Sequence, residues 1–303
     1  MTRPIAIIGA PSSIGLGPYE DGVVRHVNRA PSVLRERGLI ARLRAIDLGD
    51  VAPPPYRDFE KPPGAARNEL ELVAYSRLLG DRVSRALAHG HFALVLGGDC
   101  SVVLGCLLAA QRRAGTVGLA YVDAHADFAS PDDSAGGSAS SMALGFATGR
   151  GNSALSRLGG AMPLVSDRQV ALLGHRDDGQ RHGHGAFAES SILKVPSAQL
   201  QADDWLELAA TTLDQVAPPD VRGYWIQVDV DVLDPVAMAA VESPEPDGLT
   251  PRELLRVLTP LVQHPRALGL SVTTYDPALD PDRSCARRLV NMLEALLAPG
   301  LLH

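Results

Sequence analysis

The sequence predicts an α/β protein with three layers, in which helices cover both faces of a mostly parallel, about eight-stranded sheet. Short runs of apolar residues alternate along the chain with longer segments of helical periodicity. The apolar runs are nearly continuous, as expected for strands that are buried on both faces. Strands that alternate with helices in this way are typical of a parallel sheet.

Strand and helix patterns follow one another along the whole chain. The predicted strands are Ile5–Gly9, Leu43–Leu48, Phe92–Gly97, Val117–Asp123, Gln169–Gly174, Gly223–Asp229 and Ala267–Val272, with a further short strand near Ile192–Val195. The predicted helices are Arg67–Ala88, Ser101–Arg113, Asp203–Val216, Pro251–Val262 and Cys285–Leu297.

The loops between these elements are rich in proline, glycine and serine. We interpret the proline-rich stretch from Val51 to Gly64 as a surface loop, because strands and helices continue on both sides of it. Small residues dominate the loops at 134–141 and 149–160, and histidines stand in the loop at 176–189. Composition alone would permit two smaller domains, but this continuity predicts one domain that spans residues 1–303.

Composition argues against several classes of protein. The net charge of −7 at pH 7 gives no basis for a nucleic-acid-binding face, which would need clustered basic residues. The chain has no run of apolar residues long enough to span a membrane, so we expect no membrane partner. The first residues lack the features of a signal peptide, and we therefore expect a cytoplasmic protein.

The three cysteines fit a reducing compartment. Cys100, Cys106 and Cys285 are odd in number and widely spaced, which does not indicate a disulfide framework. Cys106 lies in an apolar run and is interpreted as a buried structural thiol.

Acidic residues and a histidine follow three of the predicted strands. Asp123, His125 and Asp127 follow one strand, and Asp229 and Asp231 follow another. Residues two apart in an extended chain point the same way, so we expect each set to converge. Ligands of parallel sheets bind beyond the carboxyl ends of the strands, where Asp99 and Cys100 also stand.

So many ligand-type side chains would repel one another without a cation between them. Divalent metal relieves that repulsion, and a carboxylate-rich set suits an ion such as Mn²⁺. Aspartates at strand ends also cap helices and turns, and a single Asp-x-His-x-Asp motif would leave that alternative open. A further motif, Asp-x-Asp at Asp229 and Asp231, follows another predicted strand and favours a metal site.

Taken together, these motifs resemble those of the arginase–agmatinase (ureohydrolase) family. The segments that look like its three metal-ligand signatures are Leu96–Ser101, Tyr121–Asp127 and Val228–Pro235. Glu242–Thr250 is similar to the segment after the third signature, and Ala30–Gly38 to the N-terminal helix. The resemblance runs from about Pro4 to Leu297 and implies an arginase-like fold.

The resemblance also implies a binuclear metal centre, with Mn most likely, and a bridging hydroxide that attacks a guanidinium carbon. It assigns one ion to Cys100, Asp123, Asp127 and Asp229, and the other to His125, Asp123, Asp229 and Asp231, so that Asp123 and Asp229 bridge. Asp127 would orient the hydroxide and carry its proton, and we take Asp127 and His125 as the catalytic candidates. Family members are trimers or hexamers, which implies a homo-oligomer.

Cys100 departs from the family pattern, which has histidine at this position in most members. A thiolate ligand is softer than imidazole and would shift preference towards Zn, Fe or Co. The alternative is that Cys100 is an unliganded buried thiol and that the first metal site is weak.

The positions that recognise arginine in arginases have also changed. Ser140 stands where arginases carry a proton-shuttling histidine, and the residues that grip the α-carboxylate align with Ala129, Gly136 and Ser138. The loop histidines His175, His182 and His184 could move a proton, although histidines in loops are usually only solvated.

Thr274 occupies the position of the glutamate that binds the guanidinium group in the family. Loss of one partner of a buried charge pair costs ~3–5 kcal/mol, which disfavours a strongly cationic guanidinium. Asp276 could take over this role after a local shift, whereas Tyr275 should point to the opposite face.

Because the other changes cluster in substrate recognition and proton transfer, and the metal ligands apart from position 100 are kept, we expect a metal-dependent hydrolase of linear, non-peptide C–N bonds. Its small-molecule substrate would be a modified guanidine, such as an N-hydroxyguanidine, or a less basic amidine or amide, with Ser138, Ser140 and Thr274 in the binding site. The alternative is a non-catalytic member of the family with a binding or structural role.

Overall fold

The computed structural model describes residues 3–18, 23–57, 61, 63–132, 134, 136–160, 163–176, 184–202 and 204–297, and gives only the backbone of His184. Several predicted features lie partly outside these residues. They are the proline-rich loop at 58–60 and 62, the serine-rich loop at 133 and 135, the loop histidine His182, and Asp203 at the start of a predicted helix.

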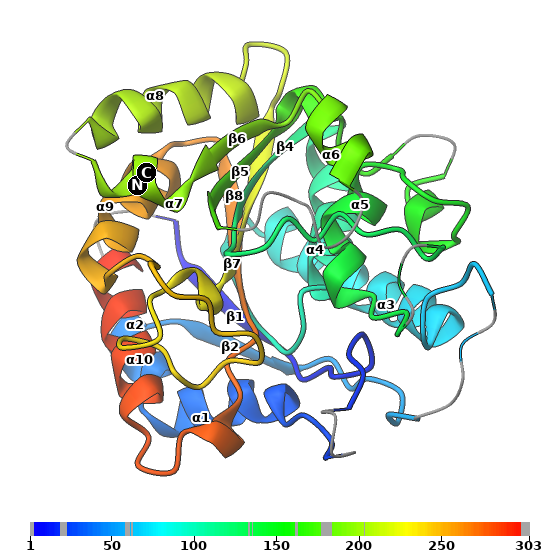
Figure 1. Cartoon of the computed structure of the whole chain (residues 1–303). Coiled ribbons are helices and arrows are strands. Elements are labelled where there is room, and N and C mark those ends of the chain that lie inside the picture. Colours follow the sequence, from blue (N-terminus) through cyan, green and yellow to red (C-terminus); the bar gives the residue numbers. More distant parts are fainter. Residues whose placement is uncertain are drawn as a thin grey trace.

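One sheet of eight parallel strands forms the middle layer, and its order is β2-β1-β3-β8-β7-β4-β5-β6 (Figure 1). The strands are β1 (Ile5–Ala10), β2 (Ile46–Asp50), β3 (Phe92–Gly97), β4 (Val117–Val122), β5 (Val170–His175), β6 (Leu193–Pro196), β7 (Gly223–Asp229) and β8 (Ala267–Thr273). The predicted parallel sheet is therefore confirmed, and the central strands are buried along their full length.

Helices form the two outer layers. On one face lie α3 (Glu69–Ala88), α4 (Val102–Ala114), α5 (Ala143–Ala147) and α6 (His184–Glu189). On the other face lie α1 (Ala30–Glu36), α2 (Leu39–Leu43), α7 (Ser197–Gln201), α8 (Trp205–Val216), α9 (Pro251–Gln263) and α10 (Ser284–Leu297). A separate apolar core fills the space between the sheet and each layer. The arrangement confirms the three-layer prediction.

The predicted strand Leu43–Leu48 begins too early. Residues 39–43 form helix α2, in which Leu39 and Leu43, one turn apart, are buried on the same face. Arg44 has a φ of 49°, in the left-handed region, which ends the helix before β2 begins at Ile46. The apolar spacing at 39–43 was a helical signal. β2 is an edge strand and is only partly buried.

The order of the strands determines where polar groups meet. The four central strands β3, β8, β7 and β4 are neighbours in the sheet, although they lie far apart along the chain. Parallel strands end at one edge, so the residues after Gly97, Val122, Asp229 and Thr273 all reach the same rim. All eight strands belong to this sheet, which fits one domain over 1–303; that domain assignment stays a prediction. Of the helices described, none has the length and apolar character needed to cross a bilayer.

Candidate metal centre

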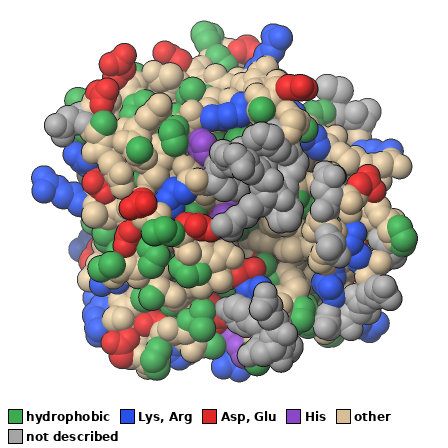
Figure 2. All heavy atoms as spheres, viewed as in Figure 1, with side chains coloured by type: hydrophobic (Ala, Val, Ile, Leu, Met, Phe, Trp, Pro, Cys, Tyr) green, Lys and Arg blue, Asp and Glu red, His purple; other side chains and the backbone are tan. Residues whose placement is uncertain are grey.

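A cavity of about 400 Å³ opens at this rim of the sheet. The candidate ligands that line it are Cys100, His125, Asp127, Asp229 and Asp231. Serines form much of the remaining wall: Ser134, Ser138, Ser140, Ser141 and Ser243. Figure 2 shows acidic and histidine side chains around a hollow near the centre of this face. The cavity therefore combines a cluster of candidate metal ligands with a wall that is rich in serine.

Cys100 is positioned by the turn between β3 and α4. A side chain at Gly98 would overlap the Ser12 carbonyl, so only glycine allows the chain to pass there. The buried carboxylate of Asp99 then accepts hydrogen bonds from the backbone of Gly15 at 3.2 Å and of Ser101 at 3.0 Å. These contacts anchor the turn and present the next residue, Cys100, to the cavity.

The Cys100 side chain is 1% exposed, and its Sγ donates to Oδ2 of Asp229 at 2.7 Å. Burial, together with the charges of Asp229 and Asp127, raises the pKa of the Cys100 thiol well above its ordinary value. A thiolate at this position therefore requires a cation beside it. That Cys100 is a metal ligand stays a prediction. Its sulfur lies within 4.8 Å of carboxylate oxygens of Asp123 and Asp127, a distance that would allow all three to bind one ion.

The second motif converges, but not by the alternation of an extended strand. β4 ends at Val122, and Oδ1 of Asp123 accepts a hydrogen bond from the backbone of His125 at 2.7 Å. Asp127 has a φ of 46°, which turns its side chain back towards Asp123. Tight turns rather than a pleat thus bring the three side chains together, and the predicted mechanism of convergence was wrong.

The third motif forms a similar turn. Asp229 is the last residue of β7, and Asp231 lies in a short 3-10 helix, Val230–Val232. Oδ1 of Asp229 accepts from the backbone of Asp231 at 2.9 Å, and Oδ1 of Asp231 accepts from the backbone of Ala124 at 3.2 Å. Hydrogen bonds therefore join the second and third motifs directly.

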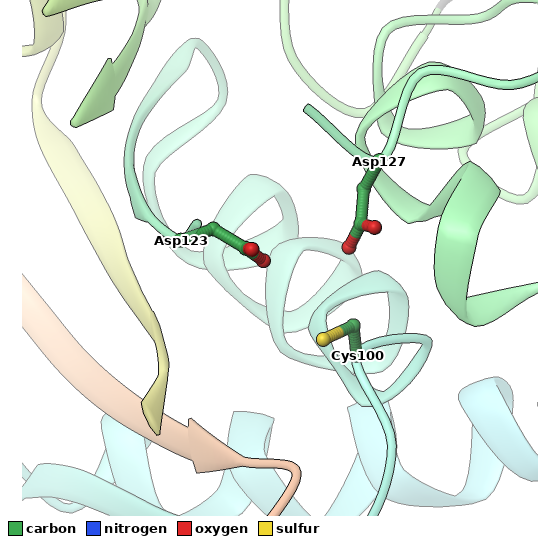
Figure 3. A group of neighbouring side chains, drawn as sticks. All are labelled: Cys100, Asp123 and Asp127. Atoms are coloured by element: carbon green, nitrogen blue, oxygen red, sulfur yellow. The ribbon is translucent and has the colours of Figure 1, made fainter. Parts of the chain in front are cut away.

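Two overlapping groups of ligand atoms result. The first contains Cys100, Asp123 and Asp127, whose side chains point towards one another in Figure 3. The second contains Asp123, His125 and Asp231, with Nδ1 of His125 3.0 Å from Oδ2 of Asp231. Within each group the ligand atoms lie within 4.8 Å of one another. Asp123 is common to both, as expected of a bridging ligand.

Charge and hydrogen bonding fit divalent cations at both groups. Oδ2 of Asp123 is buried, and no hydrogen-bond partner is found for it among the described residues. Burial and the neighbouring carboxylates raise the pKa of Asp123 and of Asp229 well above the ordinary aspartate value. A buried acceptor without a donor is costly, and metal ligation would satisfy it.

Asp229 differs from the other candidates. It belongs to neither group, although its carboxylate touches the sulfur of Cys100. Its Oδ1 also accepts a hydrogen bond from the hydroxyl of Thr274. The predicted bridging role of Asp229 therefore stays a prediction, whereas the sharing of Asp123 has direct geometric support.

The predicted substrate-binding residues all line the cavity, and each has a structural contact. Ser138 donates to the Gly15 carbonyl at 3.0 Å, and the hydroxyl of Ser140 accepts from the backbone of Cys100 at 3.3 Å. Thr274 has a φ of 68°, which is unusual for a β-branched residue, and bonds to Asp229. Its hydroxyl thus supports a candidate ligand.

Two suggested substitutes are absent from the cavity wall. Asp276 is fully buried and accepts from the backbone of His26 at 3.0 Å and of Ala278 at 2.9 Å. Its carboxylate therefore does not replace the one missing at Thr274. The ring of His175 packs edge-on against Phe187, away from the lining.

Two further residues were missed by sequence reasoning. Tyr121 lies two residues before Asp123 on β4, and its hydroxyl donates to Oδ2 of Asp127 at 2.5 Å. Glu242 lines the cavity and pairs with Arg25 at 2.9 Å. Burial raises the pKa of Glu242 to about 7, although the Arg25 guanidinium opposes this shift. An acidic residue after the apolar run 238–241 was the available signal for Glu242.

Comparisons with known proteins agree on one family. The model of the arginase family matches residues 3–298. The arginase of Staphylococcus aureus (strain COL) is 28% identical over 315 residues, which cover 99% of each chain, and that of Bacillus subtilis (strain 168) is 27% identical over the whole of both chains. The solved structure of Bacillus caldovelox arginase superposes with a TM-score of 0.86 at 27% identity and full coverage of both chains.

Proposed function

Because this chain belongs to the arginase family, we propose that it is a binuclear metal-dependent hydrolase of linear, non-peptide C–N bonds in a small molecule. The observation that carries this proposal is the pair of overlapping ligand groups, with Asp123 in both. Mn²⁺ is the expected ion, and Cys100 would favour Fe²⁺, Co²⁺ or Zn²⁺ at the first group. A homo-oligomer is expected from the family resemblance alone.

Metal ions bound here would act as Lewis acids and lower the pKa of a shared water molecule. The protein's own groups would do the rest. Asp127, held by Tyr121, would orient that water and accept its proton on the carboxylate. His125 presents Nδ1 to the cluster, and Nε2 lies 3.7 Å from Glu245, which would keep the imidazole in one orientation.

We propose that the substrate is a modified guanidine, such as an N-hydroxyguanidine, or a less basic amidine or amide, and not plain arginine. The end of β8 offers the hydroxyl of Thr274 where the family has a carboxylate, and this hydroxyl is already bonded to Asp229. Ser140 also lacks the acid–base capacity of a histidine. Both changes favour a substrate whose head group carries less positive charge and whose leaving group departs with less help from a general acid.

Product release should be assayed side by side with arginine, agmatine, guanidinobutyrate and N-hydroxyarginine, in the presence of Mn²⁺, Fe²⁺, Co²⁺ or Zn²⁺. We expect the highest kcat/KM with the N-hydroxyguanidine. Arginine turnover near the ~10⁴ M⁻¹s⁻¹ lower end typical of enzymes would contradict the substrate proposal. Failure of metal-replete protein to bind metal would contradict the hydrolase proposal itself and favour a non-catalytic role.

A further inference from the structure

Glu242 holds a distinctive place in the cavity. Of the described acidic residues that line it, Asp127, Asp229 and Asp231 are candidate metal ligands, and Glu242 is the one that is not. Its carboxylate comes from the loop after β7 and not from the end of β8. The loop thus supplies a carboxylate to the same cavity in which Thr274, directly after β8, supplies only a hydroxyl.

The carboxylate of Glu242 forms an ion pair with Arg25. Nη1 of Arg25 lies 2.9 Å from Oε1 of Glu242, and Nε of Arg25 donates to the Gly17 carbonyl at 2.7 Å. The side chains of Arg25 and Glu242 are 13% and 24% exposed, so the pair is largely shielded from water. Such shielding strengthens the pairing and fixes the orientation of the carboxylate.

Asp276 joins the two segments that carry this pair. Its side chain accepts from the backbone of His26, next to Arg25, and its own backbone N–H donates to the Ala240 carbonyl at 2.9 Å, two residues before Glu242. Asp276 thus contacts both segments, the first through its buried carboxylate and the second through its backbone N–H. The fold therefore determines the position of the Glu242 side chain, which is not a mobile surface group.

Arg25 contacts Oε1 of Glu242 through one printed atom pair, Nη1 at 2.9 Å, and a carboxylate can accept several further hydrogen bonds from a molecule in the cavity that it lines. Arg25 partly neutralises the negative charge of Glu242. The Glu242 carboxylate is therefore better suited to an N–H-rich head group of moderate basicity than a carboxylate without a cationic partner would be. On the premise of the proposed function, we infer that Glu242 is the substrate-binding carboxylate of this cavity and receives the N–H groups of a guanidinium or amidinium head. It would do so in place of the family's carboxylate at position 274.

Two probes of the same shape test this inference: butylguanidinium, which is charged, and butylurea, which is neutral. Their dissociation constants should be measured by calorimetry on Mn²⁺-loaded protein. We expect the wild type to prefer butylguanidinium. Glu242→Gln keeps the side-chain shape but loses the charge, and should weaken butylguanidinium about ten- to hundredfold while changing butylurea much less. Glu242→Asp keeps the charge and serves as a control for a folding defect; it should retain part of the preference for butylguanidinium.

Asp247→Asn is the matched comparison, since Asp247 is an exposed acidic residue of the same loop and does not line the cavity. An equal loss of preference in this variant would mean that the general potential of the loop is responsible, and would overturn the assignment of Glu242. A wild type without preference, or a preference unchanged in Glu242→Gln, would also overturn it. Metal content measured on the same samples separates the two proposals, because a protein that binds no metal contradicts the hydrolase proposal whichever probe it prefers.

Discussion

The hydroxyl of Tyr121, the penultimate residue of β4, donates a hydrogen bond to Oδ2 of Asp127, a member of the first ligand group, across 2.5 Å. The tyrosine ring is fully buried, and burial together with the Asp127 charge raises the pKa of its hydroxyl well above the ordinary value. Tyr121 therefore stays a donor, and it holds a carboxylate whose backbone already adopts a left-handed turn. Tyr121 is a positioning residue for Asp127.

Tyr121→Phe should lower kcat by about tenfold, because it removes one hydrogen bond to a charged group but keeps the ring volume. KM and metal content should change little. Steady-state kinetics on the best substrate of the panel would measure the effect. Tyr75→Phe is the control, since the Tyr75 hydroxyl bonds to the Val51 carbonyl at 3.1 Å outside the cavity lining. Loss of metal in Tyr121→Phe would contradict a positioning role.

Asp123→Asn should release both metal ions, because Asp123 alone belongs to both ligand groups. Asp231→Asn should release mainly the ion of the second group. Elemental analysis after dialysis against limiting Mn²⁺ would measure the stoichiometry, with two ions per chain expected for the wild type. The assignment of Asp123 as a bridge fails if Asp123→Asn keeps one tightly bound ion.

Cys100→His should raise the affinity for Mn²⁺, because imidazole is a harder ligand than thiolate. Thiol-reactive reagents cannot decide whether Cys100 binds metal, since a side chain that is 1% exposed is protected in either case. Absorption spectra of Co²⁺-loaded protein can decide, because cobalt–thiolate ligation adds a charge-transfer band. That band should disappear in Cys100→Ser and persist in Cys106→Ser, which changes a buried thiol outside the cavity lining. A wild-type spectrum without it would make Cys100 a non-ligand.

Metal-free protein should lose stability as the pH rises from about 5 to 8. The folded-state pKa values of Asp123, Asp229 and Glu242 are raised, so the folded state binds more protons than the unfolded state above the ordinary carboxyl pKa of about 4. The free energy of unfolding then falls with increasing pH, through the Glu242 value of about 7, by about 2–4 kcal/mol.

Urea unfolding of EDTA-treated protein at pH 5, 6, 7 and 8 would measure this slope. Mn²⁺ should remove most of it, because a cation favours the ionised carboxylates. Glu242→Gln should flatten the part of the slope below pH 7 only. Stability of the metal-free protein that increases towards pH 8 would contradict the expected burial of uncompensated charge.

The sequence by itself determined the strands of the central sheet and the position of the ligand motifs. Central strands such as Phe92–Gly97 and Gly223–Asp229 are apolar on both faces, so their pattern is local and readable. Motifs directly after such strands must lie at the carboxyl edge of a parallel sheet. The pattern was less clear at the partly exposed edge strand β2, where apolar residues of the neighbouring helix α2 were assigned to the strand.

Only the tertiary structure decided which of these groups touch. Cys100 and Asp229 are 129 residues apart, and His26 and Asp276 are 250 residues apart; their contacts follow from the strand order β3-β8-β7-β4, which no local period encodes. The same holds for Arg25 with Glu242. Turn geometry at Asp127 was equally invisible, because a left-handed φ is uncommon even for aspartate and depends on contacts of the folded protein.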